Sequence, residues 1–246
     1  MKLTRLACSA FLALVAAACQ THTPIDESAP LPEEIAPPPQ FMPATYLAPI
    51  HVDRGRYADL FSPASYAVWI GADVAAMKRA AALAKGERID PGLDRDASAI
   101  LQNYLLIECV LSSSFADMSI AYDVVGLRGI TARLLMPDGT KLDPIQTVIG
   151  PSKPDAQTGA LKTFQRTNIF VFPLKPPSGS KPLISPDIPS VRLVLEYQAN
   201  AYAFDWENSI GKAEPPPALQ KARELIESVD YNQLFGQVRR LAHMLD

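Results

Sequence analysis

The chain has 246 residues, of which 48% are hydrophobic and 20% charged, and this globular composition excludes disorder over its whole length. Its 23 lysines and arginines against 26 aspartates and glutamates leave a net charge of −3, which gives no basic surface for nucleic acid. Three cysteines and three histidines are too few for a zinc module or a disulfide-rich scaffold, so neither a metal nor another cofactor is predicted.

Residues 1–18 have the pattern of a bacterial signal peptide. Lys2 and Arg5 make its start positive, and an uncharged stretch rich in leucine and alanine follows over residues 6–18. This stretch is shorter than the roughly 20 residues that a membrane-spanning helix needs. We therefore expect it to be removed from the mature protein.

Residues 16–20 read Ala-Ala-Ala-Cys-Gln. They resemble the lipobox of bacterial lipoproteins, in which small residues precede a cysteine that receives diacylglycerol before cleavage on its amino side. The resemblance implies that Cys19 is lipidated and anchors the protein in a membrane through its acyl chains. Gln20 differs from the aspartate that marks retention at the inner membrane, which implies the outer membrane in a Gram-negative cell.

The lipobox resemblance leaves one alternative open. Ala16 stands where lipoproteins prefer leucine or valine, and the same alanines fit the small-residue rule of ordinary signal peptidase. A soluble periplasmic protein is the alternative, and in it Cys19 can pair with Cys109 in an oxidising compartment. If Cys19 is lipidated, Cys109 is a lone thiol. Its position on an apolar strand face then predicts a buried, inert side chain.

A tether is predicted over residues 19–43. Prolines alternate there with acidic residues, and large apolar residues are almost absent, so the segment is expected to be extended. The whole chain has 23 prolines, about twice the usual share. The tether would hold the folded domain away from the membrane.

An α+β domain is predicted over residues 44–246. It would comprise a helical region at 44–99, an antiparallel β-sandwich at 100–208 and C-terminal helices at 215–246. The sandwich is expected to be immunoglobulin-like with five to seven strands, and the N-terminal helix and one or two C-terminal helices should pack on it.

The first helix is predicted to begin at Ser62 and Pro63, a cap and a first-turn proline, and to run to Gly86 with a break near Gly71. Its charged residues, Lys78 among them, are expected to face solvent. The sequence Asp-Pro-Gly at 90–92 predicts a turn and helix cap rather than a calcium loop, because the ligand spacing is wrong.

Alternating apolar residues predict strands at 104–111, 163–172, 191–197 and 202–206, with a weaker one at 119–125. The strand at 163–172 is apolar on both faces, as expected for a strand covered on both sides. A further β-hairpin is predicted, in which the turn Pro-Asp-Gly at 137–139 joins residues 130–136 to residues 140–149.

The C-terminus is predicted to be helical after three prolines at 215–217. A first helix has its apolar stripe between Leu219 and Val229. A second begins at Asp230 and Gln233, which form a capping box. Both are expected to pack on the sandwich, because the second has too few basic residues for a membrane-surface helix.

No catalytic motif is recognised, and no catalytic residue is assigned. An envelope hydrolase is the alternative function, with His51 and Asp53 as base and orienting carboxylate and with Ser65 or Cys109 as nucleophile. Glu108 lies in an apolar strand and is expected either to point outward or to pair with an arginine.

Two connections, at 150–162 and 173–190, are longer than usual. Prolines stiffen the second, which is predicted to dock another envelope protein or a glycan, or else to be a passive flap over a sheet edge. Its candidate contact residues are Leu174, Lys175, Lys181, Leu183, Ile184 and Ile188. The predicted function is a lipid-anchored, non-enzymatic envelope protein with a binding or structural role.

Overall fold

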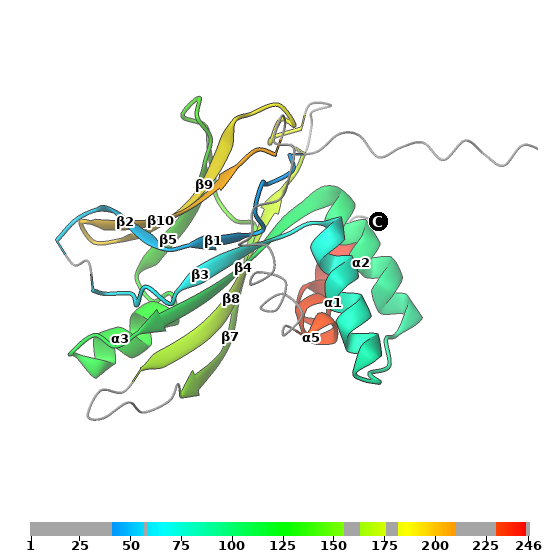
Figure 1. The fold of residues 1–246 in the computed structure, drawn as a ribbon, viewed down its shortest axis with the longest axis horizontal. Coiled ribbons are helices and arrows are strands. Elements are labelled where there is room, and N and C mark those ends of the chain that lie inside the picture. Colours follow the sequence, from blue (N-terminus) through cyan, green and yellow to red (C-terminus); the bar gives the residue numbers. More distant parts are fainter. Residues whose placement is uncertain (1–40, 57–58, 155–162, 176–181, 210–229, 245–246) are drawn as a thin grey trace, which may run out of the picture. The chain divides into compact units, whose positions relative to one another are not determined.

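Ten strands form two antiparallel five-stranded sheets in the described part of the chain (Figure 1). The computed structural model describes residues 41–56, 59–154, 163–175, 182–209 and 230–244. The signal peptide, Cys19 and most of the predicted tether lie outside these residues. The coarse prediction of an α+β antiparallel sandwich is confirmed, and the predicted number of five to seven strands is too low.

The first sheet has the order β1-β3-β4-β8-β7, and the second has the order β2-β10-β9-β5-β6. The strands of the first sheet are β1 (Leu47–Pro49), β3 (Tyr66–Ile70), β4 (Tyr104–Ser113), β8 (Phe164–Pro173) and β7 (Gln146–Pro154). Those of the second are β2 (His51–Arg54), β10 (Asn200–Glu207), β9 (Ser190–Tyr197), β5 (Ile130–Leu135) and β6 (Lys141–Leu142).

The first sheet is covered on both faces, as β8 shows residue by residue. Phe170 and Phe172 belong to the core between the two sheets. Ile169 and Val171, which alternate with them, belong to a second core under the helices. Because successive side chains of a strand point to opposite faces, a strand between two cores must be apolar at nearly every position. The prediction for 163–172 is confirmed.

The core between the sheets is built around two tryptophans. Trp69 of β3 and Trp206 of β10 meet edge to face, with ring centroids 5.6 Å apart. The Trp206 indole Nε1 donates a hydrogen bond to the Tyr46 carbonyl at 3.1 Å. Cys109 lies in the same core as a free, buried thiol. The expected burial is thus confirmed. Burial raises the pKa of this thiol, and the nearby charge of Glu108 raises it further, which disfavours the reactive thiolate.

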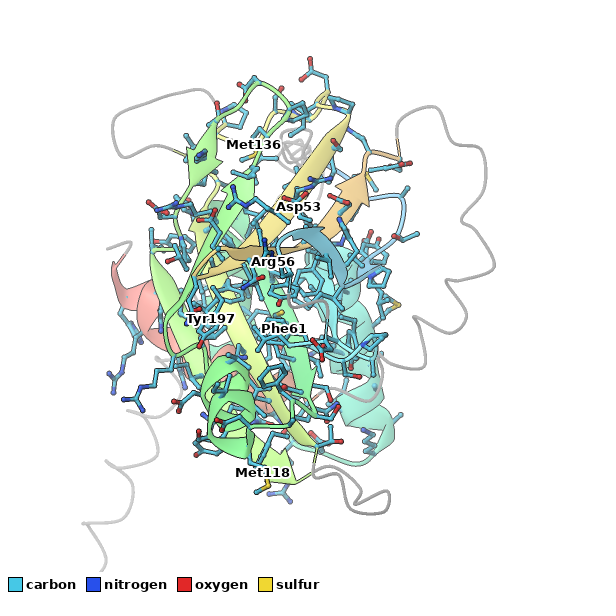
Figure 2. All side chains as sticks on the ribbon, turned by 90° about the vertical axis from the view of Figure 1, so that its left-hand side faces the viewer. Asp53, Arg56, Phe61, Met118, Met136 and Tyr197 are labelled. Carbon is cyan, nitrogen blue, oxygen red and sulfur yellow. The ribbon has the colours of Figure 1, made fainter. Side chains whose placement is uncertain are left out.

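Three helices lie on the other face of the first sheet (Figure 1). They are α1 (Ala72–Ala84), α2 (Pro91–Asn103) and α5 (Tyr231–Val238), and a 3₁₀ helix follows at Arg239–Met244. The fourth helix, α3 (Met118–Val125), contributes Val124 and Val125 to the core between the sheets. Met118 and Met136 mark opposite ends of the sandwich in Figure 2, so α3 closes one of these ends.

Two of the three predicted helix caps are confirmed, whereas Ser62 is followed by a strand and caps no helix. The Asp90 side chain accepts a hydrogen bond from the Gly92 amide at the start of α2, and Asp230 accepts from the amides of Asn232 and Gln233 at the start of α5. Such caps satisfy amides that have no partner within the first turn of a helix. The predicted helix between Leu219 and Val229 lies outside the described residues.

Three predicted elements are wrong in part. Residues 66–70 form β3 rather than helix, because Ala67 and Trp69 enter one core while Val68 and Ile70 enter the other. Residues 118–125 form α3 rather than a strand, since Asp117 caps the segment. The region 44–99 therefore contains three strands before its first helix, which begins after Gly71 where a break was expected.

The predicted hairpin is real but short. The Met136 amide donates to the Thr140 carbonyl across the turn, and β6 returns along β5 for two residues only. From Gln146 the chain joins the first sheet as β7, where it pairs with β8. The twofold pattern at 140–149 thus belongs to two strands in two different sheets.

Candidate functional site

A network of ion pairs covers the outer face of the second sheet. We call this surface the charged face; it comprises His51, Asp53, Arg54, Arg133, Asp143, Arg192, Glu196 and Asp205. Beneath it are the small buried side chains of Val194, Ala201 and Ala203. Since β9 alternates Arg192, Val194 and Glu196 along one face, long charged side chains lie beside short apolar ones. The stems of the arginines can then rest on the sheet.

One half of the charged face is centred on Arg192. Its Nε donates to Asp205 at 2.6 Å and its Nη1 to Asp53 at 2.8 Å. The hydrogen bond with Asp205, helped by the charges of Asp205 and Asp53, raises the pKa of the guanidinium. His51 Nε2 lies 3.4 Å from the same Asp205 carboxylate. Arg192 therefore joins β2, β9 and β10 across the sheet, and Asp53 can be located in Figure 2.

The other half is centred on Glu196. This carboxylate accepts from Arg54 at 3.2 Å and from Arg133 at 3.3 Å, and Arg133 also donates to Asp143 at 2.9 Å. Exposed pairs of this kind contribute at most about 1 kcal/mol each to stability. Their main effect is to give the face a fixed pattern of charge in which positive and negative groups alternate.

The side chains proposed for a hydrolase are held by other partners. His51 faces Asp205 and Asp53 faces Arg192, so the structure places both on the charged face but does not pair them. The buried Ser65 hydroxyl donates to the Ser112 carbonyl at 3.2 Å and accepts from the Ser112 amide at 3.0 Å. Cys109 lies in the core. Each has a structural role that its own contacts explain.

The least expected polar contact lies between α1 and the first sheet. Lys78 of α1 is 0% exposed and Glu108 of β4 is 2% exposed, and Lys78 Nζ lies 3.0 Å from Glu108 Oε2. The prediction that Lys78 faces solvent is wrong. Glu108 points to the helix-covered face, where its partner is a lysine rather than an arginine.

Burial lowers the pKa of Lys78, although the carboxylates of Glu108 and Asp230 oppose this shift. Each charge of a buried ion pair needs its partner, because removal of a charge from water costs a large free energy that the opposite charge must offset. Lys78 and Glu108 therefore bind α1 to β4 at one specific position. The one acidic residue in the apolar stretch 104–111 was the signal in the sequence that marked this site.

A second set of ion pairs fixes the C-terminal helix to α2. Arg239 Nε donates to Asp96 at 2.6 Å and its Nη1 donates to Asp90 at 3.0 Å. The Tyr231 hydroxyl donates to Asp94 at 2.9 Å, and Arg79 binds the same carboxylate. These contacts explain why the helix beginning at Tyr231 lies against α2.

The predicted docking loop turns its apolar side chains inward. Ile184 is 3% exposed in the core between the sheets, and Leu174 and Ile188 pack against that core. The Leu183 amide donates to the Leu174 carbonyl at 2.8 Å. Ile184, Leu174 and Ile188 are thus held by the domain itself, which favours the alternative of a flap.

The remaining loop residues are placed differently. Lys175 is exposed and Leu183 is half-buried, while Lys181 lies outside the described residues. Docking by this loop therefore stays a prediction, and among the described candidates Lys175 is the one that is exposed rather than partly or fully buried. A deletion of the whole loop would remove Ile184 from the core as well, so single substitutions are needed to test it.

Ile184→Ala is expected to lower the free energy of unfolding by about 2–5 kcal/mol, because a buried isoleucine side chain is lost and a cavity remains. Lys175→Ala should change it by no more than about 0.5 kcal/mol. Urea denaturation followed by circular dichroism measures both. A cost below about 1 kcal/mol for Ile184→Ala would mean that the loop does not contribute to the core.

Comparison with protein-family models, with curated proteins and with solved structures gave no significant match to this chain. Among the described residues, no three His, Cys, Asp or Glu side chains are grouped as metal ligands would be. None of the described helices has the length and apolar character required to cross a membrane.

Proposed function

We propose that this protein is a lipid-anchored component of a bacterial cell envelope, and that it acts by binding or bracing a partner rather than by catalysis. The observation that carries the proposal is the order of segments in the sequence. A signal peptide ends at a lipobox-like Cys19, and a proline-rich acidic tether at 19–43 precedes the folded domain. This order suits a domain presented at a distance from a membrane surface.

The architecture supports a binding or structural role. Helices cover one sheet, and the other presents the charged face, whose side chains are fixed by their mutual ion pairs. A preorganised polar surface loses little entropy when a partner docks. We propose another envelope protein or a glycan as that partner, and we include the immunoglobulin-like character of the sandwich in this proposal.

The soluble periplasmic protein is the second candidate, because Ala16 departs from the lipobox pattern. In that case Cys19 is free to form a disulfide. Cys109 is buried in the core, so a bond to it would require a local rearrangement of the sandwich.

Cys19→Ala is expected to abolish lipid labelling and to move the protein from the detergent phase to the aqueous phase. Its thiol is the proposed acyl acceptor, and the folded domain offers no other anchor in this proposal. The measurement is incorporation of a palmitate analogue by growing bacteria, followed by phase separation in a cloud-point detergent.

Cys8→Ala is the matched control, since it removes a cysteine within the predicted signal peptide and should leave labelling and partition unchanged. Absence of label from the unaltered protein, together with recovery in the soluble periplasmic fraction, would overturn the proposal in favour of the soluble alternative.

A further inference from the structure

The four edge strands of the two sheets are protected to different degrees. An exposed edge has unpaired amide and carbonyl groups that can pair with another strand, and proteins protect such edges with short strands, charges, prolines and bulges. β1 has three residues and ends at a proline, β6 has two residues, and β2 has three charged or ionisable residues among its four. β7, by contrast, has nine residues.

The unprotected part of β7 and its approach is residues 145–149, Ile-Gln-Thr-Val-Ile. It has no charged residue, and it lies between Pro144 and Pro151. A bulge between Ile149 and Ser152 disturbs the register beyond it. In the described part of the chain β7 pairs only with β8, so its other edge is open (Figure 1). We call residues 145–149 the open edge.

The side chains of the open edge divide between two surroundings. Val148 packs against the core under the helices. Ile145 and Ile149 are 51% and 50% exposed, respectively, and Thr147 between them is also exposed. The register places Thr147 beside Phe170 and Ile149 beside Asn168, so these residues lie on the side of the sheet that faces the second sheet. That second sheet ends nearby in the two-residue β6, which leaves the isoleucines partly uncovered.

The open edge is complementary to itself. We propose that β7 pairs antiparallel with β7 of a second copy of this chain, about a twofold axis at Thr147. This register places Ile145 of each copy opposite Ile149 of the other and Thr147 opposite its own equivalent. Every cross-strand pair on the exposed side is then apolar or hydroxyl-bearing, and no like charges meet. A twofold interface must be self-complementary in this way.

The same pattern identifies a second copy of this chain as the partner of the open edge. The backbone groups of the edge require an extended strand, and the palindromic order Ile-x-Thr-x-Ile fits its own sequence in the antiparallel direction. Pairing would join two five-stranded sheets into one continuous sheet. The interface is small, so the dimer is expected to be weak and dependent on concentration. The inference goes beyond the proposed function and holds for an anchored or a soluble protein alike.

A disulfide trap tests the register directly. Residues opposite each other in an antiparallel pair have Cα atoms about 4.5–5.5 Å apart, which is within the range that a disulfide spans. Thr147→Cys in the full-length protein is expected to give a cross-linked dimer under mild oxidation. Thr140→Cys, at an exposed position in the β5–β6 turn, is the matched control and should not. Cys19 and Cys109 are present in both variants, so their contribution cancels.

A charge exchange tests the same pairing without a covalent bond. The double substitution Ile145→Lys with Ile149→Lys would place like charges opposite each other across the two copies, and this should weaken self-association at least about tenfold. Ile145→Glu with Ile149→Glu should do the same, and an equimolar mixture of the two double variants should restore a dimer. Both substitutions are at half-exposed positions, and circular dichroism checks that each variant is folded.

Sedimentation equilibrium over a range of concentrations measures the association. The expected result is a dimer for the unaltered protein, monomers for each charged variant and a mixed dimer for their mixture. A protein that stays monomeric at all concentrations, with Thr147→Cys cross-linking no faster than Thr140→Cys, would overturn the inference. Neither outcome depends on lipidation of Cys19, so failure here is distinct from failure of the proposed function.

Discussion

Replacing Glu108 by leucine is expected to lower the free energy of unfolding by about 3–5 kcal/mol. The substitution leaves the ammonium group of Lys78 in a site that is 0% exposed, without the carboxylate 3.0 Å away that compensates its charge. Because the Lys78 side chain has no exposed surface, water does not reach its ammonium group to replace that partner. Guanidinium chloride denaturation at neutral pH measures the change.

The double variant Lys78→Met with Glu108→Leu is the decisive control for this pair. It removes both charges and keeps apolar side chains of similar length between α1 and β4. Replacement of a buried ion pair in this way is often neutral or even stabilising, so most of the lost stability should return. Arg54→Met, which breaks an exposed pair with Glu196, should cost less than about 1 kcal/mol.

Two results would contradict the interpretation that Lys78 and Glu108 form a buried, mutually dependent pair. If Glu108→Leu costs no more than Arg54→Met, then water reaches Lys78 and the helical layer is not closed over it. If the double variant is as unstable as the single one, the volume of the side chains rather than their charge is responsible.

Trp206→Ala is expected to be the second strongly destabilising change, at about 3–5 kcal/mol. The side chain is fully buried between the sheets, its ring meets Trp69, and its indole nitrogen donates to the Tyr46 carbonyl. Removal leaves a large cavity, and the Tyr46 carbonyl loses one of its two donors and keeps the Trp69 amide at 2.8 Å. Trp206→Phe keeps an aromatic ring but no donor, so we expect it to cost less than Trp206→Ala.

Fluorescence gives an independent measurement at the same position. The chain has two tryptophans, and both lie in the contact between the sheets. Their emission should be blue-shifted in the native protein and should shift to longer wavelength in one step with the loss of circular dichroism. Emission typical of solvent-exposed indole in the folded state would contradict the packing of the two sheets.

The sequence predicts the covered strands best. Residues 104–111 of β4, apart from Glu108, and residues 169–172 of β8 are apolar because they lie between two cores, and this pattern is visible without the fold. β3 has the same property, yet its apolar residues also fit a helical period that continues into α1. The sequence pattern therefore predicts one continuous helix where the structure has a short strand followed by a helix.

The ion pairs of the charged face could not be predicted from local patterns in the sequence. Arg192 and Asp205 are opposite each other only because β9 and β10 pair in one particular register. Asp53, which also contacts Arg192, lies 139 positions away from it in the sequence. Lys78 and Glu108 meet because a helix crosses a strand. Such contacts depend on tertiary packing, whereas the caps at Asp90 and Asp230 depend on neighbouring residues and were predicted correctly.

The central claim, that Cys19 anchors the protein in a membrane, is tested most directly by mass spectrometry of the mature N-terminal peptide. The account predicts that this peptide begins at Cys19 and has the added mass of a diacylglycerol group. A mature N-terminus at another residue, or an unmodified Cys19 joined by a disulfide to Cys109, would contradict it.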